Sequence, residues 1–151
     1  MIVMDIGCGM GFFSLSMAEL VGSSGKVICI DLQREMIKGL LKRAEKKNLL
    51  QRIDARVCSA ASLGLGDFPG KIDFAILFAL AHEVPDKKRL FSEVHAAMKP
   101  GKQLLVAEPR GHVSEAEFAK TVSVAQEAGF EPLAELQIRR SRAVLMQTQM
   151  R

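Results

Sequence analysis

The sequence predicts a doubly wound α/β domain, in which helices cover both faces of a mainly parallel sheet. Short apolar or β-branched runs alternate along the chain with longer segments of helical period, which is typical of this fold class. The chain has 151 residues, the length of one ordinary domain, and no internal repeat or linker divides it. We therefore expect a single domain over residues 1–151, with a core that needs no disulfide or metal staples.

The first expected strand starts almost at the first residue. Residues Ile2 to Ile6 form an apolar run, a glycine-rich loop follows, and a helical period runs from Phe12 to Leu20 and stops at Gly22. The second strand is expected at Lys26 to Ile30. The helix after it, Arg34 to Lys47, has an apolar stripe on one side and basic residues on the other, which we interpret as a solvated face.

The second half of the chain continues the alternation and then changes its period. A capping box at Ser114 to Glu117 predicts a helix that ends at Gly129. Two antiparallel strands are expected after it, joined across Arg139 to Arg142, whose arginines are interpreted as a solvated hairpin turn. The remaining elements are expected as strands at Ala55 to Cys58, Ile72 to Phe78, Gln103 to Ala107, Glu131 to Ile138 and Ala143 to Thr148, a helix at Lys87 to Met98, and a turn at Lys99-Pro100-Gly101.

The composition argues against several classes of protein. The three cysteines, Cys8, Cys29 and Cys58, are an odd number without a C-x-x-C pair, which favours free thiols and a cytoplasmic location. The net charge of +4 comes from interspersed residues, so it predicts no nucleic-acid-binding arm. The longest apolar run, residues 74–81, is far shorter than the roughly 20 residues of a membrane helix. We expect no nucleic-acid partner, no membrane anchor and no metal site.

The loop from Gly7 to Gly11 carries the clearest chemical signal. It follows a strand and opens a helix, where alternate glycines let a ligand approach the bare backbone and free N–H groups can bind a carboxylate or phosphate. A dinucleotide fingerprint would need its third glycine at the position of Phe12, so an NAD-dependent oxidoreductase is the weaker alternative. Asp5, at the end of an apolar strand, needs a cation or donors, and a ligand ammonium would meet this need.

With these residues the chain resembles the class I S-adenosylmethionine-dependent methyltransferases, and among them the ubiquinone and menaquinone C-methyltransferases. The resemblance implies a Rossmann-like sheet of seven strands in the order 3-2-1-4-5-7-6, mostly parallel with the last strand antiparallel, and S-adenosyl-L-methionine as the cofactor. It covers nearly the whole chain, through the first motif at Val3 to Gly11, the acid after the second strand at Ile30-Asp31, the fourth strand and its His-Glu-Val-Pro-Asp segment at Asp73 to Asp86, the fifth-strand motif at Met98 to Pro109, and the turn at Glu127 to Glu131.

The resemblance also implies roles for individual residues. In the family, an acid matching Asp31 binds both ribose hydroxyls, and Asp5 would meet the methionine ammonium, directly or through water. Where the family usually has Gly-Asp-Ala after the third strand, this chain has Cys58-Ser59-Ala60, and Ser59 would be a weaker acceptor for the adenine amino group. The other implied cofactor contacts are the loop N–H groups at Gly7, Cys8, Gly9 and Gly11, the Ala60 amide, and the apolar side chains of Leu32, Met36 and Phe78, for which a core role is as plausible.

His82 is the candidate catalytic residue. It follows the fourth strand at the carboxyl edge of the sheet, where ligands of such sheets bind, and a histidine can act as a general base near neutral pH. Packing or capping of the turn at Pro85-Asp86 is an equally open interpretation. A base is needed only for a weakly acidic hydroxyl or carbon acceptor, because methyl transfer from a sulfonium is a direct displacement. The role of Glu108 is left open, and His112 follows the fifth strand.

We therefore expect a methyltransferase that acts on a small-molecule acceptor. The Asn-Pro-Pro-Tyr motif of enzymes that methylate amino groups of bases or glutamine is absent after the fourth strand. The related enzymes carry helices before the first strand that cover the cofactor, and here none are expected. The site would then be open, or closed by a homodimer or partner chain, or the chain is a truncated gene product. A cofactor-binding module without catalysis is the second hypothesis.

Overall fold

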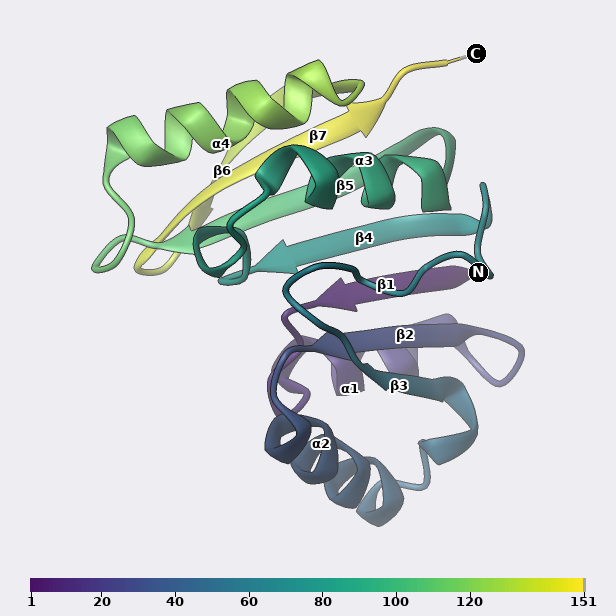
Figure 1. The fold of residues 1–151 in the computed structure, drawn as a ribbon. Coiled ribbons are helices and arrows are strands. Elements are labelled where there is room, and N and C mark those ends of the chain that lie inside the picture. The colour runs from purple at the N-terminus through teal and green to yellow at the C-terminus, as the bar shows by residue number, and fades with distance from the viewer. Residues whose placement is uncertain (151) are drawn as a thin grey trace.

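Seven strands form one sheet in the order β3-β2-β1-β4-β5-β7-β6 in the computed structural model, which describes residues 1–150 (Figure 1). Neighbouring strands from β3 to β5 are parallel, and β7 runs antiparallel to both β5 and β6. This order and these directions confirm the predicted sheet. The strands are β1 (Ile2–Ile6), β2 (Lys26–Asp31), β3 (Ile53–Val57), β4 (Ile72–Phe78), β5 (Met98–Pro109), β6 (Phe130–Ile138) and β7 (Ser141–Thr148).

Helices cover the two faces of the sheet in pairs, α1 and α2 on one side and α3 and α4 on the other. Each face has its own apolar core, because alternate residues of a strand point to opposite sides. Val3 belongs to the core under α1 and α2, whereas its neighbour Met4 belongs to the core under α3 and α4. The helices are α1 (Phe12–Val21), α2 (Arg34–Lys46), α3 (Lys87–Ala97) and α4 (Glu115–Glu127), with short 3-10 helices η1 (Leu50–Arg52) and η2 (Ala81–Glu83).

The predicted turn at Lys99-Pro100-Gly101 is wrong, because these residues belong to β5. Met98 pairs with Ile72, and the register shifts before Phe74 pairs with Gln103, so the strand continues through an irregularity. Gly101 has a φ of +73°, and proline is tolerated at such a bulge because the ladder loses a donor there anyway. The Thr148 hydroxyl donates to the Lys99 carbonyl at 2.9 Å, which ties this stretch to β7. A distant strand therefore overrides a local turn signal.

None of the helices within residues 1–150 combines the length and the hydropathy of a membrane span.

The predicted helix start at Ser114 is confirmed, with Ser114 as the N-cap of α4. The Ser114 hydroxyl accepts from the Glu117 N–H at 3.1 Å and lies 3.2 Å from the Glu117 carboxylate. We expect Ser114→Ala to lower the free energy of unfolding by about 1 kcal/mol, because one N–H of the first turn loses its acceptor. Urea unfolding measures this change, and Ser114→Asp, which keeps an acceptor, is the control. A loss of less than about 0.3 kcal/mol for the alanine variant would contradict the role of the cap.

Candidate functional site

The predicted site residues gather where β1, β2, β3, β4 and β5 end at one edge of the sheet. β1 and β4 are neighbours, yet the chain leaves β1 towards α1 on one face and leaves β4 towards α3 on the other. Open α/β sheets bind their ligands at such a switch point, because the two diverging connections leave a crevice between them. Figure 1 shows the glycine loop between β1 and α1 at this edge.

The three glycines of the loop differ in what surrounds them. Gly7 has a φ of +82°, and a Cβ there would lie 2.6 Å from the carbonyl oxygen of Phe78 at the end of β4. Gly11 has a φ of +96°, and a Cβ there would overlap the Leu40 side chain of α2. Gly9 has a φ of +56° and nothing within 4 Å of its missing Cβ. Gly7 and Gly11 are therefore required by packing, whereas a side chain at Gly9 would meet nothing. The N–H groups of all three glycines donate to acceptors within the chain.

Asp31 connects the glycine loop to the segment before α2. Its carboxylate, in a residue only 9% exposed, accepts from the Gly9 N–H at 3.0 Å and from the Gln33 N–H at 2.8 Å. The N–H of Cys58, after β3, donates to the Asp31 carbonyl at 2.9 Å. One acid at the end of β2 thus joins three segments that carry predicted cofactor contacts.

Asp5 is buried at the end of β1 and only half satisfied. The Ser14 hydroxyl of α1 donates to Oδ2 at 2.6 Å, while Oδ1 has no hydrogen-bond partner among the described residues. Burial raises the pKa of Asp5 to about 6, against the lowering effect of the Ser14 hydrogen bond. A buried carboxylate oxygen without a donor is costly, so this position fits a group that brings an N–H or a positive charge.

Sequence reasoning missed Ser14. The sequence offered one signal: Ser14 lies four residues before Ala18, so the helical period places both on the same face of the expected helix, and the structure shows both buried.

The other predicted cofactor contacts lie around the same edge, and their side chains differ in how far they are buried. Cys8 packs into the core under α1 and α2, its N–H donates to the Ile30 carbonyl at 3.0 Å, and burial raises the pKa of its thiol. Leu32 and Met36 are half-buried near the start of α2, and Leu32 packs against the larger core. Phe78 is half-buried, with its ring centroid 5.0 Å from that of Phe13.

Ser59 and Ala60 lie in an exposed turn after β3. The Ser59 hydroxyl oxygen accepts from the N–H groups of Ala61 and Ser62, at 3.2 and 3.1 Å. Arg89, at the start of α3, donates to the Ala60 carbonyl at 2.7 Å. Sequence reasoning missed Arg89, because no motif or spacing in the sequence indicates a contact between Arg89 and Ala60.

His82 forms a close pair with Glu108. Its Nδ1 lies 2.6 Å from Glu108 Oε2, and its backbone N–H donates to Glu108 Oε1 at 3.2 Å. The Glu108 side chain is 1% exposed, and burial raises its pKa although the His82 hydrogen bonds act to lower it. The His112 ring lies parallel to the His82 ring, with the centroids 6.3 Å apart. Glu108, whose role the sequence left open, is therefore the partner of His82.

Two grooves of the surface lie away from this edge. A groove of about 610 Å³ runs between α4 and the outer strands and is lined by residues such as Phe118, Leu133 and Glu135. A second, of about 530 Å³, lies at the opposite edge of the sheet and is lined by residues such as Met17, Phe74 and Gln103. Neither contains a predicted site residue, so the carboxyl edge of the sheet remains the candidate site on the chemistry of its side chains.

The chain is similar to known methyltransferases in sequence. A family model described as "Methyltransferase domain" matches residues 1–144. Demethylmenaquinone methyltransferase of Oceanobacillus iheyensis is 29% identical over 105 residues, which are 70% of this chain and 43% of that protein. Ubiquinone/menaquinone biosynthesis C-methyltransferase UbiE of Hydrogenovibrio crunogenus is 25% identical over 107 residues, 71% of this chain and 41% of that protein. The matched segment thus spans less than half the length of these relatives.

Solved structures share the fold at low sequence identity. A SAM-dependent methyltransferase from Aquifex aeolicus superimposes with a TM-score of 0.84 at 21% identity, covering 98% of this chain and 82% of that one. The [4+2]-cyclase SpnF superimposes with a TM-score of 0.81 at 15% identity, covering 99% of this chain and 76% of that one. These likenesses concern the fold alone, since one fold hosts several chemistries. By the family model matched over residues 1–144, the chain belongs to the class I S-adenosylmethionine-dependent methyltransferases.

Proposed function

We propose that this chain is the catalytic domain of a methyltransferase that transfers a methyl group from S-adenosyl-L-methionine to a small-molecule acceptor. The observation that carries the proposal is the buried Asp5 carboxylate, whose Oδ1 lacks a donor among residues 1–150 and which lies beside the N-terminus of α1. The cofactor has an ammonium for the first feature and a carboxylate for the second. A nicotinamide dinucleotide offers no aliphatic ammonium, which disfavours the oxidoreductase alternative.

The residues of the edge fit the parts of the cofactor. Asp5 would hold the ammonium, the N-terminus of α1 the carboxylate, and Asp31 the ribose hydroxyls. Ser59 and the Ala60 amide would meet the base, and Leu32, Met36 and Phe78 would supply apolar contacts. When bound, the cofactor supplies an electrophilic methyl group on a sulfonium, so the protein mainly has to orient the acceptor.

The pairing of His82 with Glu108 supports a role as general base. With Nδ1–H donating to the buried Glu108 carboxylate, Nε2 of the neutral ring is left to accept a proton. This tautomer is an assignment from the hydrogen-bond partner. A buried acid also stabilises the imidazolium that forms when the proton is taken. The pair therefore suits an acceptor with a weakly acidic hydroxyl or carbon, from which the proton passes to Nε2 as the methyl group arrives.

A cofactor-binding module without methyl transfer is the second candidate. The observation that favours it is the likeness to the [4+2]-cyclase, which shows that this fold also carries other chemistry. The two candidates differ in one respect. The module transfers no methyl group, so it has no turnover that a change at His82 could reduce. We also propose that a homodimer or a partner chain closes the acceptor side. A cytoplasmic location, which the free cysteines favour, is proposed as well.

Asp31→Ala should weaken the binding of S-adenosylhomocysteine by about tenfold to a hundredfold, because hydrogen bonds to a charged acceptor are lost. Isothermal titration measures the affinity. Glu35→Ala is the control, since this exposed acid of α2 pairs with the exposed Lys38 at 3.6 Å. Melting curves of both variants verify folding. Equal affinities for a folded Asp31→Ala variant and the unchanged chain would refute the assignment.

Asp5→Asn should stabilise the free protein at about pH 8 by about 1 kcal/mol, while abolishing tight cofactor binding. The pKa of Asp5 is raised to about 6, so the folded state holds this proton more strongly than the unfolded state. The resulting stabilisation is complete at low pH and is lost as the pH rises through about 6.

The stability difference between Asp5→Asn and the unchanged chain should therefore shrink towards about pH 4. Urea unfolding at both pH values measures it, with the exposed Glu19→Gln of α1 as control. An Asp5→Asn variant less stable than the unchanged chain at the higher pH would show that the unpaired Oδ1 does not destabilise the folded protein.

His82→Asn should lower kcat by about a hundredfold or more, with the affinity for the cofactor unchanged, because a general base contributes to the rate and not to cofactor binding. Glu108→Gln should lower kcat less, because the ring keeps a hydrogen-bond partner but loses the negative charge that stabilises the imidazolium. Release of S-adenosylhomocysteine with a panel of phenolic and enolisable acceptors gives the rates, and Lys88→Ala of α3 is the control. Unchanged rates for His82→Asn with an accepted substrate would remove His82 from the mechanism.

A further inference from the structure

The turn after β3 uses up the acceptor capacity of Ser59. Its hydroxyl oxygen accepts from the N–H groups of Ala61 and Ser62, and Ser59 and Ser62 also exchange two backbone hydrogen bonds, at 3.2 and 3.4 Å. A hydroxyl has two acceptor lone pairs and one O–H donor. Both lone pairs are engaged by the turn, so the O–H is the group that Ser59 can still offer to a ligand.

The surroundings of the turn also offer donors. Among the described residues, none accepts from the Ala60 N–H, and the Arg89 guanidinium lies at the Ala60 carbonyl. The neighbouring carboxylate, Glu93, is occupied on both oxygens, by Arg89 Nη1 at 3.0 Å and by the Leu63 N–H at 2.8 Å. Both Glu93 oxygens are therefore directed at α3 and at the turn itself.

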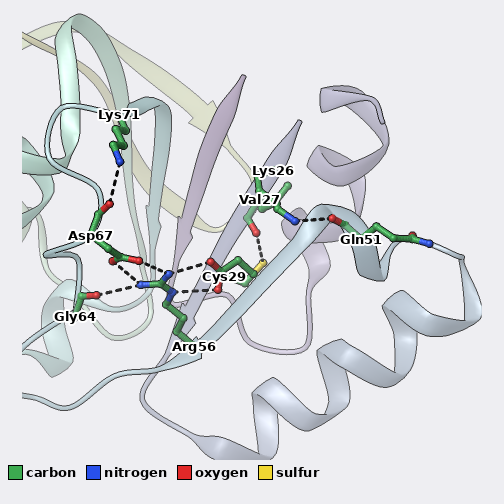
Figure 2. Close-up of polar contacts among 9 residues, drawn as sticks. Lys26, Val27, Cys29, Gln51, Arg56, Gly64, Asp67 and Lys71 are labelled. Atoms are coloured by element: carbon green, nitrogen blue, oxygen red, sulfur yellow. Dashed lines mark hydrogen bonds and ion pairs between the residues drawn. The ribbon is translucent and has the colours of Figure 1, made fainter. Parts of the chain in front are cut away.

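The turn is held in place from two sides. Arg89 and Glu93 of α3 bind its backbone at Ala60 and Leu63, and Leu63 is 4% exposed in the main core. Further along, Arg56 of β3 donates to Asp67 at 2.7 and 2.8 Å and to the Gly64 carbonyl at 3.2 Å (Figure 2). The guanidinium also lies 4.8 Å from the ring centroid of Phe68. These contacts fix the backbone of the turn that the Ser59 hydroxyl caps.

We propose that Ser59 donates a hydrogen bond to a ring nitrogen of the cofactor base and does not accept one from the 6-amino group. This inference rests on the proposed function, and it differs from the acceptor role that the family resemblance implies for this position. A carboxylate in this place has two oxygens, so it can close the turn with one and accept from the amino group with the other. A serine has a single oxygen, which the turn already uses. The chain should therefore be indifferent to the 6-amino group.

The test compares the affinities of S-adenosylhomocysteine and of its analogue with hydrogen in place of the 6-amino group, by isothermal titration of the full chain. The matched variants are Ser59→Asp and Ser59→Asn. Both can close the turn through one side-chain oxygen, but the free atom is an acceptor in the first and a donor in the second. Melting curves verify that both variants fold.

The unchanged chain and Ser59→Asn should bind the two ligands within roughly threefold of each other. Ser59→Asp should prefer S-adenosylhomocysteine by about tenfold or more, because its free oxygen gains a donor in the amino group. A tenfold preference of the unchanged chain that Ser59→Asp does not increase would overturn the inference and leave the proposed function intact. If neither ligand binds the unchanged chain, the proposed function falls as well.

Discussion

The close approach of Gly7 to the end of β4 is the constraint on which the site depends. A side chain at position 7 would collide with the Phe78 carbonyl, so only glycine lets the loop after β1 lie against β4. With the loop in this place, the Gly7 and Cys8 N–H groups reach the Ile30 carbonyl of β2, and Gly9 reaches Asp31. β4 then turns away through Ala79, which has a φ of +59° and donates to the Ala107 carbonyl. This turn brings η2, with His82, to the end of β5.

The fold could be predicted from the sequence because its signals are local. Strands buried on both faces read as apolar runs, and β1, β4 and the start of α2 are found at the predicted residues. The prediction failed at Lys99 to Gly101, where the local composition indicates a turn. Pairing with β4 and the Thr148 hydroxyl of β7 decide the conformation there, and both partners are distant in sequence.

The candidate site could be predicted in part for the same reason. Asp5, Asp31 and the glycines stand at strand ends, and strand ends of a parallel sheet meet at one edge. The pairing of His82 with Glu108 and the contact of Arg89 with Ala60 join residues that lie 26 and 29 positions apart. No periodicity or spacing rule specifies such side-chain contacts, because they depend on how η2 and α3 sit on the sheet.

The position of α3 between two parts of the site has a thermodynamic consequence. The helix is anchored in the core by Leu90, Phe91 and Val94, its Arg89 and Glu93 hold the turn that carries Ser59, and its first residue follows closely on η2. A shift of this helix would move the turn that carries Ser59 together with the segment that follows His82. A ligand bound on one side would then change the affinity on the other by a coupling free energy, and such coupling is reciprocal.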